Sequence, residues 1–411
     1  MTEMHSKRVL LSAFACSPFR GSEEGIGWHW AVEIANLGYR VTVLTRAIHC
    51  EEIMGAPGQT ALERLTFEFL DPAPWIRFEG ATKPLGYIYY YFWQILALQK
   101  ARRMHRKTPF DLIHHITYGG IRLPTFLGRL GIPMIVGPLG GGETAPSALR
   151  KGYSIRGKLV DAARDLSNSL IRFDPLMHET FSSSSMIILR TRENLKCIPE
   201  YYRDRIHFEH DIGVDCQEIR SEPMLSDGPL RILYLGRALS WKGMHLGLRA
   251  YAELLKEHPK AKLTLVGDGP DKRSWQRLAA DIGVQSQVKW VNWIPHTEVG
   301  RLYADNDVLL FPTLHEAGGT VLYEAAAHGR PVICLDLGAP GELVTPEIGF
   351  KIAALGRSEA DVISDISVAL KTLATDREHL ANLGAAARKW AETQSWQSRV
   401  RNVYKKSPAR S

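Results

Sequence analysis

Two glutamates, a glycine pair and a threonine have the residue types and the spacing of a site for a phosphorylated sugar. Glu316 precedes Gly318 and Gly319, which permit close backbone approach, and the free amides of a following helix would face a phosphate. Thr320 and Glu324 lie four positions apart and share one helix face. A carboxylate at Glu324 can accept two hydrogen bonds from a ribose diol. The pattern predicts a nucleotide-sugar site; the alternative is an ordinary strand-loop-helix unit with solvated glutamates.

Two cations follow the first apolar run of the second half of the chain. Arg237 and Lys242 come directly after the predicted strand 230–235, where a diphosphate leaving group would need its charge neutralised. Alternatively, Arg237 forms a surface ion pair and Lys242 only begins a helix. The turn 267–270 (Gly-Asp-Gly-Pro) ends the next strand, but it lacks the full dinucleotide fingerprint.

The elements that must position these residues follow from the alternation of apolar runs and helix-period segments, which is typical of parallel βαβ sheets. The alternation occurs twice. Strands are expected at 9–14, 40–45, 65–70, 112–115, 134–137 and 186–190, and then at 230–235, 263–266, 288–291, 308–311 and 332–335. The chain is therefore predicted to be an α/β protein with two Rossmann-like, doubly wound domains facing a central cleft.

The domain boundary is expected in a polar, turn-rich segment without periodicity. We place the N-terminal domain at 1–220, the linker at 221–229 and the C-terminal domain at 230–384. A C-terminal helix at about 385–411 could pack back on the first domain.

In order and spacing, the residues of 230–344 resemble the second domain of retaining glycosyltransferases with the GT-B fold, in particular family four, glycosyl transferases group 1. The resemblance implies that Arg237 and Lys242 hold the donor diphosphate, that Glu324 binds the ribose and that Glu316 contacts the transferred sugar. It also implies a donor site with backbone contributions from Gly318, Gly319, Thr320 and Val321, and a base site near Trp293 and Ile294. Many relatives carry a bulky aromatic or a small polar residue at the position of Gly318, so a roomier sugar pocket is expected here.

Two glycine loops in the first half are candidates for the opposite side of such a site. Gly21 and Ser22 resemble the family's glycine loop that closes on the diphosphate, although a plain helix cap explains them equally. Gly141, Gly142 and Glu143 could serve the acceptor; the alternative is a flexible turn.

The histidine that often contacts the sugar in this family is missing, because Leu139 and Gly140 stand at its place. His114 and His115 end the preceding predicted strand, and strand alternation points them to opposite faces. We expect His115 to face the site and His114 to be structural.

No metal is expected. The run 305–307 (Asp-Asn-Asp) resembles the metal motif of another glycosyltransferase fold, but its position before a strand indicates a capping turn. No cofactor is expected either, since a nucleoside diphosphate sugar would be a substrate. The mechanism that the resemblance implies is retaining transfer along a front face. A covalent adduct on Glu316 remains open, as do an epimerase, a phosphorylase and a noncatalytic binding subunit.

Composition limits the partners. The 411 residues are 45% hydrophobic and 23% charged, with five scattered cysteines, which indicates a globular chain of two domains in a reducing cytoplasm. No export signal and no membrane-spanning run are expected. The net charge of +7 and two basic clusters, at 100–107 and 150–158, favour an anionic membrane surface or a solvated helix face. Nucleic acid is not expected.

The aromatic and basic segment 85–107 is the candidate acceptor-side element. It could lie on a membrane and deliver a lipid-linked glycan, or it could be a core helix.

Overall fold

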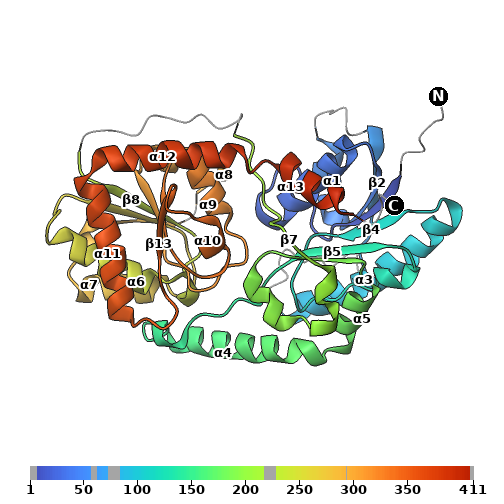
Figure 1. Cartoon of the computed structure of the whole chain (residues 1–411), viewed down its shortest axis with the longest axis horizontal. Coiled ribbons are helices and arrows are strands. Elements are labelled where there is room, and N and C mark those ends of the chain that lie inside the picture. The colour runs from blue at the N-terminus through green and yellow to red at the C-terminus, as the bar shows by residue number, and fades with distance from the viewer. Residues whose placement is uncertain (1–6, 57–62, 73–83, 217–227, 293, 408–411) are drawn as a thin grey trace. The chain divides into compact units, whose positions relative to one another are not determined.

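The structure, a computed structural model, describes residues 7–56, 63–72, 84–216, 228–292 and 294–407. Contacts divide the chain into two compact units, each with its own parallel sheet (Figure 1). The first unit comprises Met1–Gly142, Asn168–Ile212 and Trp396–Ser411, and the second comprises Glu143–Ser167 and Gly213–Ser395.

The first unit is a seven-stranded sheet in the order β3-β2-β1-β4-β5-β6-β7. All of its strand pairs are parallel. The strands are β1 (Arg8–Ser12), β2 (Arg40–Thr45), β3 (Leu65–Phe69), β4 (Leu112–His115), β5 (Met134–Leu139), β6 (Met186–Leu189) and β7 (Ile206–Phe208). The helices that begin in its half of the chain are α1 (Ser22–Asn36), α2 (Cys50–Met54), α3 (Pro84–Lys107), α4 (Ile155–Leu170) and α5 (Pro175–Ser183). Strands such as β4 and β6 are buried along their whole length, as expected for a parallel sheet covered on both faces.

The second unit is a six-stranded parallel sheet in the order β10-β9-β8-β11-β12-β13. The strands are β8 (Arg231–Leu235), β9 (Lys262–Val266), β10 (Val288–Val291), β11 (Val308–Phe311), β12 (Val332–Leu335) and β13 (Gly349–Ile352). The helices are α6 (Met244–Leu255), α7 (Lys272–Asp281), α8 (His296–Ala304), α9 (Thr320–Ala327), α10 (Gly338–Leu343), α11 (Glu359–Thr375) and α12 (Arg377–Glu392). The strand order reverses between β8 and β11, and ligands of doubly wound sheets bind at the carboxyl ends of the strands at such a point.

The predicted fold class is confirmed in its two doubly wound α/β sheets. Strands β2, β4, β10, β11 and β12 have the predicted bounds, and the other predicted strands differ by one or two residues at an end. The short strands β7 and β13 were not predicted.

The units differ from the predicted linear division in the segment that precedes and includes most of α4. Glu143–Ser167 belongs to the second unit, because Leu149 and Tyr153 are buried in the core of that unit. Of the predicted linker, 221–227 lies outside the described residues.

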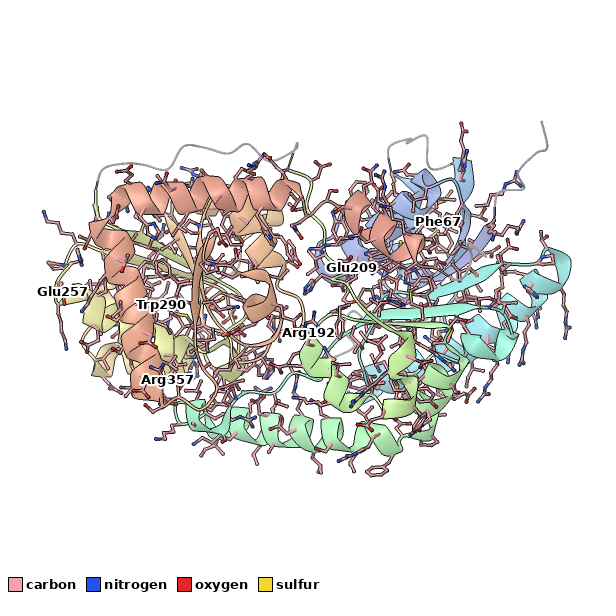
Figure 2. All side chains as sticks on the ribbon, viewed as in Figure 1. Phe67, Arg192, Glu209, Glu257, Trp290 and Arg357 are labelled. Atoms are coloured by element: carbon pink, nitrogen blue, oxygen red, sulfur yellow. The ribbon has the colours of Figure 1, made fainter. Side chains whose placement is uncertain are left out.

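The helix α13 (Trp396–Lys405) belongs to the first unit. Its Arg399 donates to Glu209, labelled in Figure 2, over 2.6 Å, and Tyr404 lies within hydrogen-bond distance of His114. On the same unit, Trp28 of α1 stacks on Phe67 of β3 with 5.9 Å between the ring centres. Within the described residues, no helix is both long enough and apolar enough to cross a membrane.

Candidate functional site

The loop after β8 is held in place by the loop after β11. It ends in a short 3-10 turn, Ser240–Lys242, and in Gly243, whose φ of +71° starts α6. A Cβ at Gly243 would stand 1.8 Å from the carbonyl oxygen of Pro312. The amide of Leu314 donates to the carbonyl of Trp241 over 2.8 Å. Only glycine allows the chain to pass so close to Pro312, and this close approach fixes Lys242 against the end of β11.

The turn 267–270 supports this arrangement from the side of β9. Gly267 has a φ of +140°, and a Cβ there would lie 1.9 Å from the carbonyl oxygen of Gly236. The amide of Ala238 donates to the carbonyl of Asp268, and Asp271 accepts from the amide of Ser240 over 2.8 Å. The glycines of this turn therefore serve close packing of one loop on another.

The central charged pair of the site joins Lys242 to Glu316. The ammonium binds the carboxylate and lies 5.0 Å from the ring centre of Phe311. Their side chains are only 15% and 20% exposed. Burial disfavours charge on Glu316, but Lys242, His315 and the Gly318 amide outweigh it and hold the pKa of Glu316 below its ordinary value. Glu316 is therefore ionised at neutral pH, and the two predicted residues lie together.

The start of α9 lies next to this pair. Gly319 is the N-cap with a φ of +100°, and Thr320 is the first helical residue. Thr320 does not cap the helix with its hydroxyl, because the N-cap position belongs to Gly319. The first turn of a helix has N–H groups without intrahelical acceptors, and the residues Thr320 and Val321 supply two of them.

Glu324 lies one turn further along α9 and is oriented by a buried tyrosine. The hydroxyl of Tyr303 donates to Oε2 of Glu324 over 2.9 Å. Burial and this carboxylate raise the pKa of Tyr303 well above its usual value, so that the tyrosine stays a donor. His328 stacks on Tyr303 with 4.9 Å between the ring centres. Glu324 is half-buried, so its carboxylate lies partly at the surface of the second unit.

A buried histidine and aspartate next to Glu316 were missed by the sequence analysis. His315 stacks on Trp241 at 5.2 Å between the ring centres, and its Nε2 lies 3.1 Å from Oδ1 of Asp161 on α4. Burial lowers the pKa of His315, while His315, Arg150 and Arg164 outweigh burial and lower the pKa of Asp161. A neutral His315 therefore donates to an ionised Asp161. No local pattern in the sequence links 161 to 315.

The remaining predicted residues of the second unit that the structure describes, Arg237 and Ile294, are exposed or half-buried. Arg237 is exposed, and its guanidinium has no ion pair among the described residues. Ile294 follows β10 and is half-buried, whereas Trp293 lies outside the described residues.

The glycine loop of the first unit leads into α1 as predicted. Gly21 is the N-cap of α1 and is exposed, and Ser22 is the first residue of the helix. A Cβ at Gly27 would lie 2.1 Å from the carbonyl oxygen of Ala15, so this glycine serves packing. Glu23 accepts from the amide of Tyr118 over 2.9 Å.

The predicted acceptor loop is largely used by the protein itself. The carbonyl of Gly141 accepts from Arg122 over 3.0 Å, and the amide of Gly142 donates to Asn194 over 2.8 Å. Glu143 is fully buried, with Arg164 3.7 Å from its carboxylate. The amide of Gly142 and the carboxylate of Glu143, which we expected on the acceptor side, therefore each have a partner inside the protein.

His115, which we expected to face the site, lies inside the first unit in this structure. His115 is 1% exposed. Its ring nitrogens lie within hydrogen-bond distance of Ser12 and Tyr90. Burial lowers the pKa of His114 to about 4 and that of His115 to about 3. The two rings do point to opposite faces, but both faces of β4 are covered.

Asp307 forms a structural ion pair. It is fully buried and binds the backbone amide and guanidinium of Arg231, with Arg377 at 3.4 Å. Within the described residues, no group of three or more His, Cys, Asp or Glu side chains is arranged to hold a metal.

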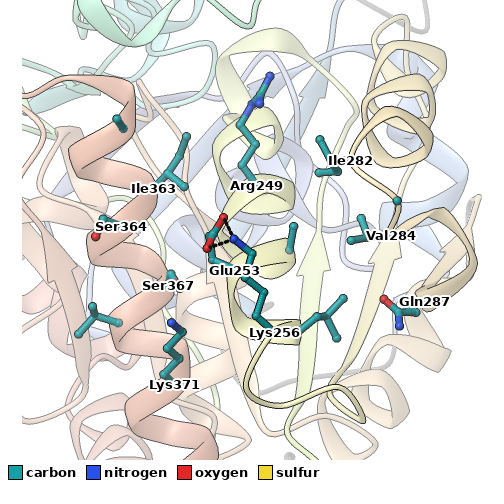
Figure 3. A pocket seen from close by; sticks show the side chains of 15 residues that line it. Arg249, Glu253, Lys256, Ile282, Val284, Gln287, Ile363, Ser364, Ser367 and Lys371 are labelled. Atoms are coloured by element: carbon teal, nitrogen blue, oxygen red, sulfur yellow. Dashed lines mark hydrogen bonds and ion pairs between the residues drawn. The ribbon is translucent and has the colours of Figure 1, made fainter.

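A separate surface pocket lies far along α6 from these loops. It is lined by the C-terminal half of α6, the segment after α7 and α11 from Ala360 to Lys371 (Figure 3). In a parallel sheet the C-terminal ends of the helices lie at the amino ends of the strands. The pocket is therefore distinct from the cluster around Lys242 and Glu316.

Solved structures of known proteins share this architecture. Over its whole length the chain is similar to sucrose-phosphate synthase from Thermosynechococcus elongatus, with a TM-score of 0.65, 17% identity, and 97% of this chain and 98% of that chain covered. For WaaG, a glycosyltransferase involved in lipopolysaccharide biosynthesis, the TM-score is 0.58 at 19% identity, with 96% and 98% covered. The fold is GT-B.

Residues 215–390 match the family described as Glycosyl transferases group 1. A GDP-mannose-dependent alpha-(1-6)-phosphatidylinositol monomannoside mannosyltransferase from Mycolicibacterium smegmatis is 31% identical over 187 residues, which cover 44% of this chain and 47% of that protein. A glycogen synthase from Mycobacterium tuberculosis is 29% identical over 161 residues, or 38% of this chain and 39% of that protein. The chain thus matches less than half the length of these relatives. The residues that match the glycosyl transferases group 1 family, 215–390, contain every predicted donor-site residue of the second unit.

Proposed function

We propose that this protein is a retaining glycosyltransferase that moves a sugar from a nucleoside diphosphate sugar to an acceptor hydroxyl. The observation that carries the proposal is the Lys242–Glu316 pair beside the N-terminal amides of α9, at the point where the strand order reverses. Sequence relatives that are named for GDP-mannose or for glycosyl transfer support it.

Each group in the cluster has a role in this proposal. Lys242 has three N–H donors, so one can bind Glu316 while another binds a phosphate oxygen. Arg237, exposed and without an ion pair among the described residues, is the second cation for the diphosphate. Glu324 accepts from the ribose hydroxyls, and Glu316 holds a hydroxyl of the transferred sugar.

The proposed chemistry follows a front face. The bond between the anomeric carbon and the diphosphate oxygen breaks, and the acceptor oxygen bonds to the same face of that carbon. The acceptor proton passes to the departing diphosphate, whose charge Lys242, Arg237 and the α9 amides stabilise. No metal and no cofactor take part. A covalent adduct on Glu316, trapped and located by mass spectrometry, would replace this path with a double displacement.

The decisive test is Glu324→Gln, compared with Glu298→Gln, an exposed glutamate in the first turn of α8. Binding of GDP-mannose and UDP-glucose is measured by thermal shift and calorimetry. Loss of a hydrogen bond to a charged group predicts a roughly 10- to 100-fold weaker donor for Glu324→Gln, and no change for Glu298→Gln. Equal binding by both variants would remove the assignment. An epimerase would turn over without an acceptor, a phosphorylase would need phosphate, and a noncatalytic subunit would bind without turnover.

We further propose a glycan or lipid-linked acceptor and a location in the cytoplasm, peripheral on an anionic membrane. On α3, Tyr89, Tyr90 and Trp93 are core residues, whereas Ile88 and Phe92 are more than half exposed. Arg102, Arg103 and Arg106 are exposed towards the end of the same helix. Neutralising these three arginines should weaken flotation with anionic liposomes, and unchanged flotation would remove α3 from the proposal.

A further inference from the structure

The helix α4 is amphipathic with its polar side towards the protein. On the inward side, Asp161 binds His315, and Arg164 donates to the carbonyl of Glu143 over 3.0 Å. Gly157 lies on the same side, where a Cβ would stand 2.1 Å from the hydroxyl oxygen of Ser240. Surface helices normally bury their apolar stripe and expose polar residues; α4 does the reverse.

The outward side of α4 carries an apolar stripe. Ile155 is 81% exposed, Leu159 67% and Leu166 62%, and Leu170 continues the stripe at the end of the helix with 53%. Successive intervals of four, seven and four residues place these side chains on one helix face. Exposed apolar residues are common singly, but a continuous stripe on a soluble surface marks an interaction site.

Basic side chains flank the stripe and identify its partner. Arg156 and Lys158 are exposed on either side of it, and Lys151 is exposed just before the helix. Asp161 faces inward, and the remaining acid of the helix, Asp165, is paired with Arg150 over 2.7 Å. The outer face of α4 therefore combines apolar bulk with uncompensated positive charge, which is the pattern of helices that lie in the interface of anionic lipid.

We propose that the outer face of α4 is a docking surface for an anionic lipid membrane, with Ile155, Leu159 and Leu166 inserted among the acyl chains and with Lys151, Arg156 and Lys158 at the head groups. The inference deepens the proposed membrane location and rests on it, but it involves no residue of α3. Because Asp161 on the inner face binds the neighbour of Glu316, the docked helix would be connected directly to the loop that holds the Lys242–Glu316 pair.

The test uses the full chain and flotation with vesicles of phosphatidylglycerol or of phosphatidylcholine. The wild type should float with the first and not with the second. The triple variant Ile155→Gln, Leu159→Gln, Leu166→Gln should lose roughly 100-fold in partition, on the order of fivefold for each half-inserted side chain. The matched control Leu355→Gln, Val368→Gln changes residues that are 74% and 58% exposed elsewhere on the second unit, and it should float as the wild type does.

A second pair of variants tests the charge. Arg156→Glu with Lys158→Glu should weaken flotation about 25-fold or more, because each cation near an anionic surface contributes roughly fivefold. Lys260→Glu with Lys289→Glu changes the net charge equally at exposed positions and should have little effect.

Absence of flotation by the wild type, or equal losses in the α4 variants and their controls, would overturn the inference. So would a lipid-free dimer, measured by light scattering, that the apolar triple variant abolishes, since a second copy would then cover the stripe. Glu324→Gln should float normally. Flotation without donor binding by the wild type would therefore refute the proposed activity alone, and donor binding without flotation would refute the membrane surface alone.

Discussion

Replacing Gly243 by alanine would test the contact that fixes Lys242. The alanine would have to adopt a φ of +71°, and its Cβ would stand 1.8 Å from the carbonyl oxygen of Pro312. The first effect costs about 1–2 kcal/mol. The second requires a backbone shift of about 1 Å or more, and forced shifts of this kind in packed regions cost roughly 1–3 kcal/mol.

The chain offers a control that separates the two effects. Gly356 has the same φ of +71°, and among the described residues no atom lies within 4 Å of the point where its Cβ would stand. Gly356→Ala should therefore cost only about 1–2 kcal/mol. In a unit of this size 1 kcal/mol corresponds to roughly 2–4 °C, so scanning calorimetry should find about 3–6 °C lost for Gly356→Ala and about 10 °C for Gly243→Ala.

The same two variants should differ in their affinity for nucleoside diphosphates. A shift of the turn that carries Lys242 would remove a charged hydrogen bond to the diphosphate, and GDP or UDP should bind about 10- to 100-fold more weakly to Gly243→Ala. Gly356→Ala should bind as the wild type does. Equal losses of stability in the two variants would refute the close approach to Pro312, whatever the nucleotide results.

Three further changes test the buried charges. A histidine whose pKa is lowered to about 3 stabilises the fold above pH 6.5, and this contribution is lost progressively as the pH falls below 6.5. Urea titrations should therefore find that His115→Gln loses about 2 kcal/mol less stability between pH 7 and pH 5 than the wild type does. An unchanged pH profile would contradict the burial of His115. Asp161→Ala should lower stability by about 1–3 kcal/mol because His315 loses its acceptor, whereas Asp161→Asn, which retains an acceptor, should lose less; equal losses would argue against the hydrogen bond. Asp307→Ala should lower the free energy of unfolding by about 3–5 kcal/mol, because Arg231 loses its buried partner. EDTA should leave sugar transfer unchanged, and inhibition by EDTA would indicate that a metal takes part.

Much of the fold follows from the sequence because parallel strands are short apolar runs bounded by turns. Strand β11 shows this most clearly, because the apolar run 308–311 is short and is followed by the turn signal of Gly318 and Gly319. Strand β13 has only two buried residues at its ends and a lysine between them, so its sequence gives no such signal.

The site was predicted in its residue types more than in its contacts. Lys242 and Glu316 were each assigned to donor binding, and the structure pairs them. The burial of His115 was not anticipated, because strand alternation separates two faces but cannot tell that both are covered. Asp161 was missed because its partner is 154 positions away, and such pairings depend on tertiary structure rather than on local pattern.

The division of the chain between the units has a consequence for folding during synthesis. Glu143–Ser167 is made before Gly213–Ser395, yet it belongs to the same unit, and Trp396–Ser411 completes the first unit last. On a ribosome, the inner face of α4, with Asp161, must therefore wait for its partner His315 until the β8–β13 sheet has been made. A fragment starting at 213 would also leave His315 without Asp161 and His245 without the carbonyl of Leu149. Neither unit can be cut from this chain as one continuous piece.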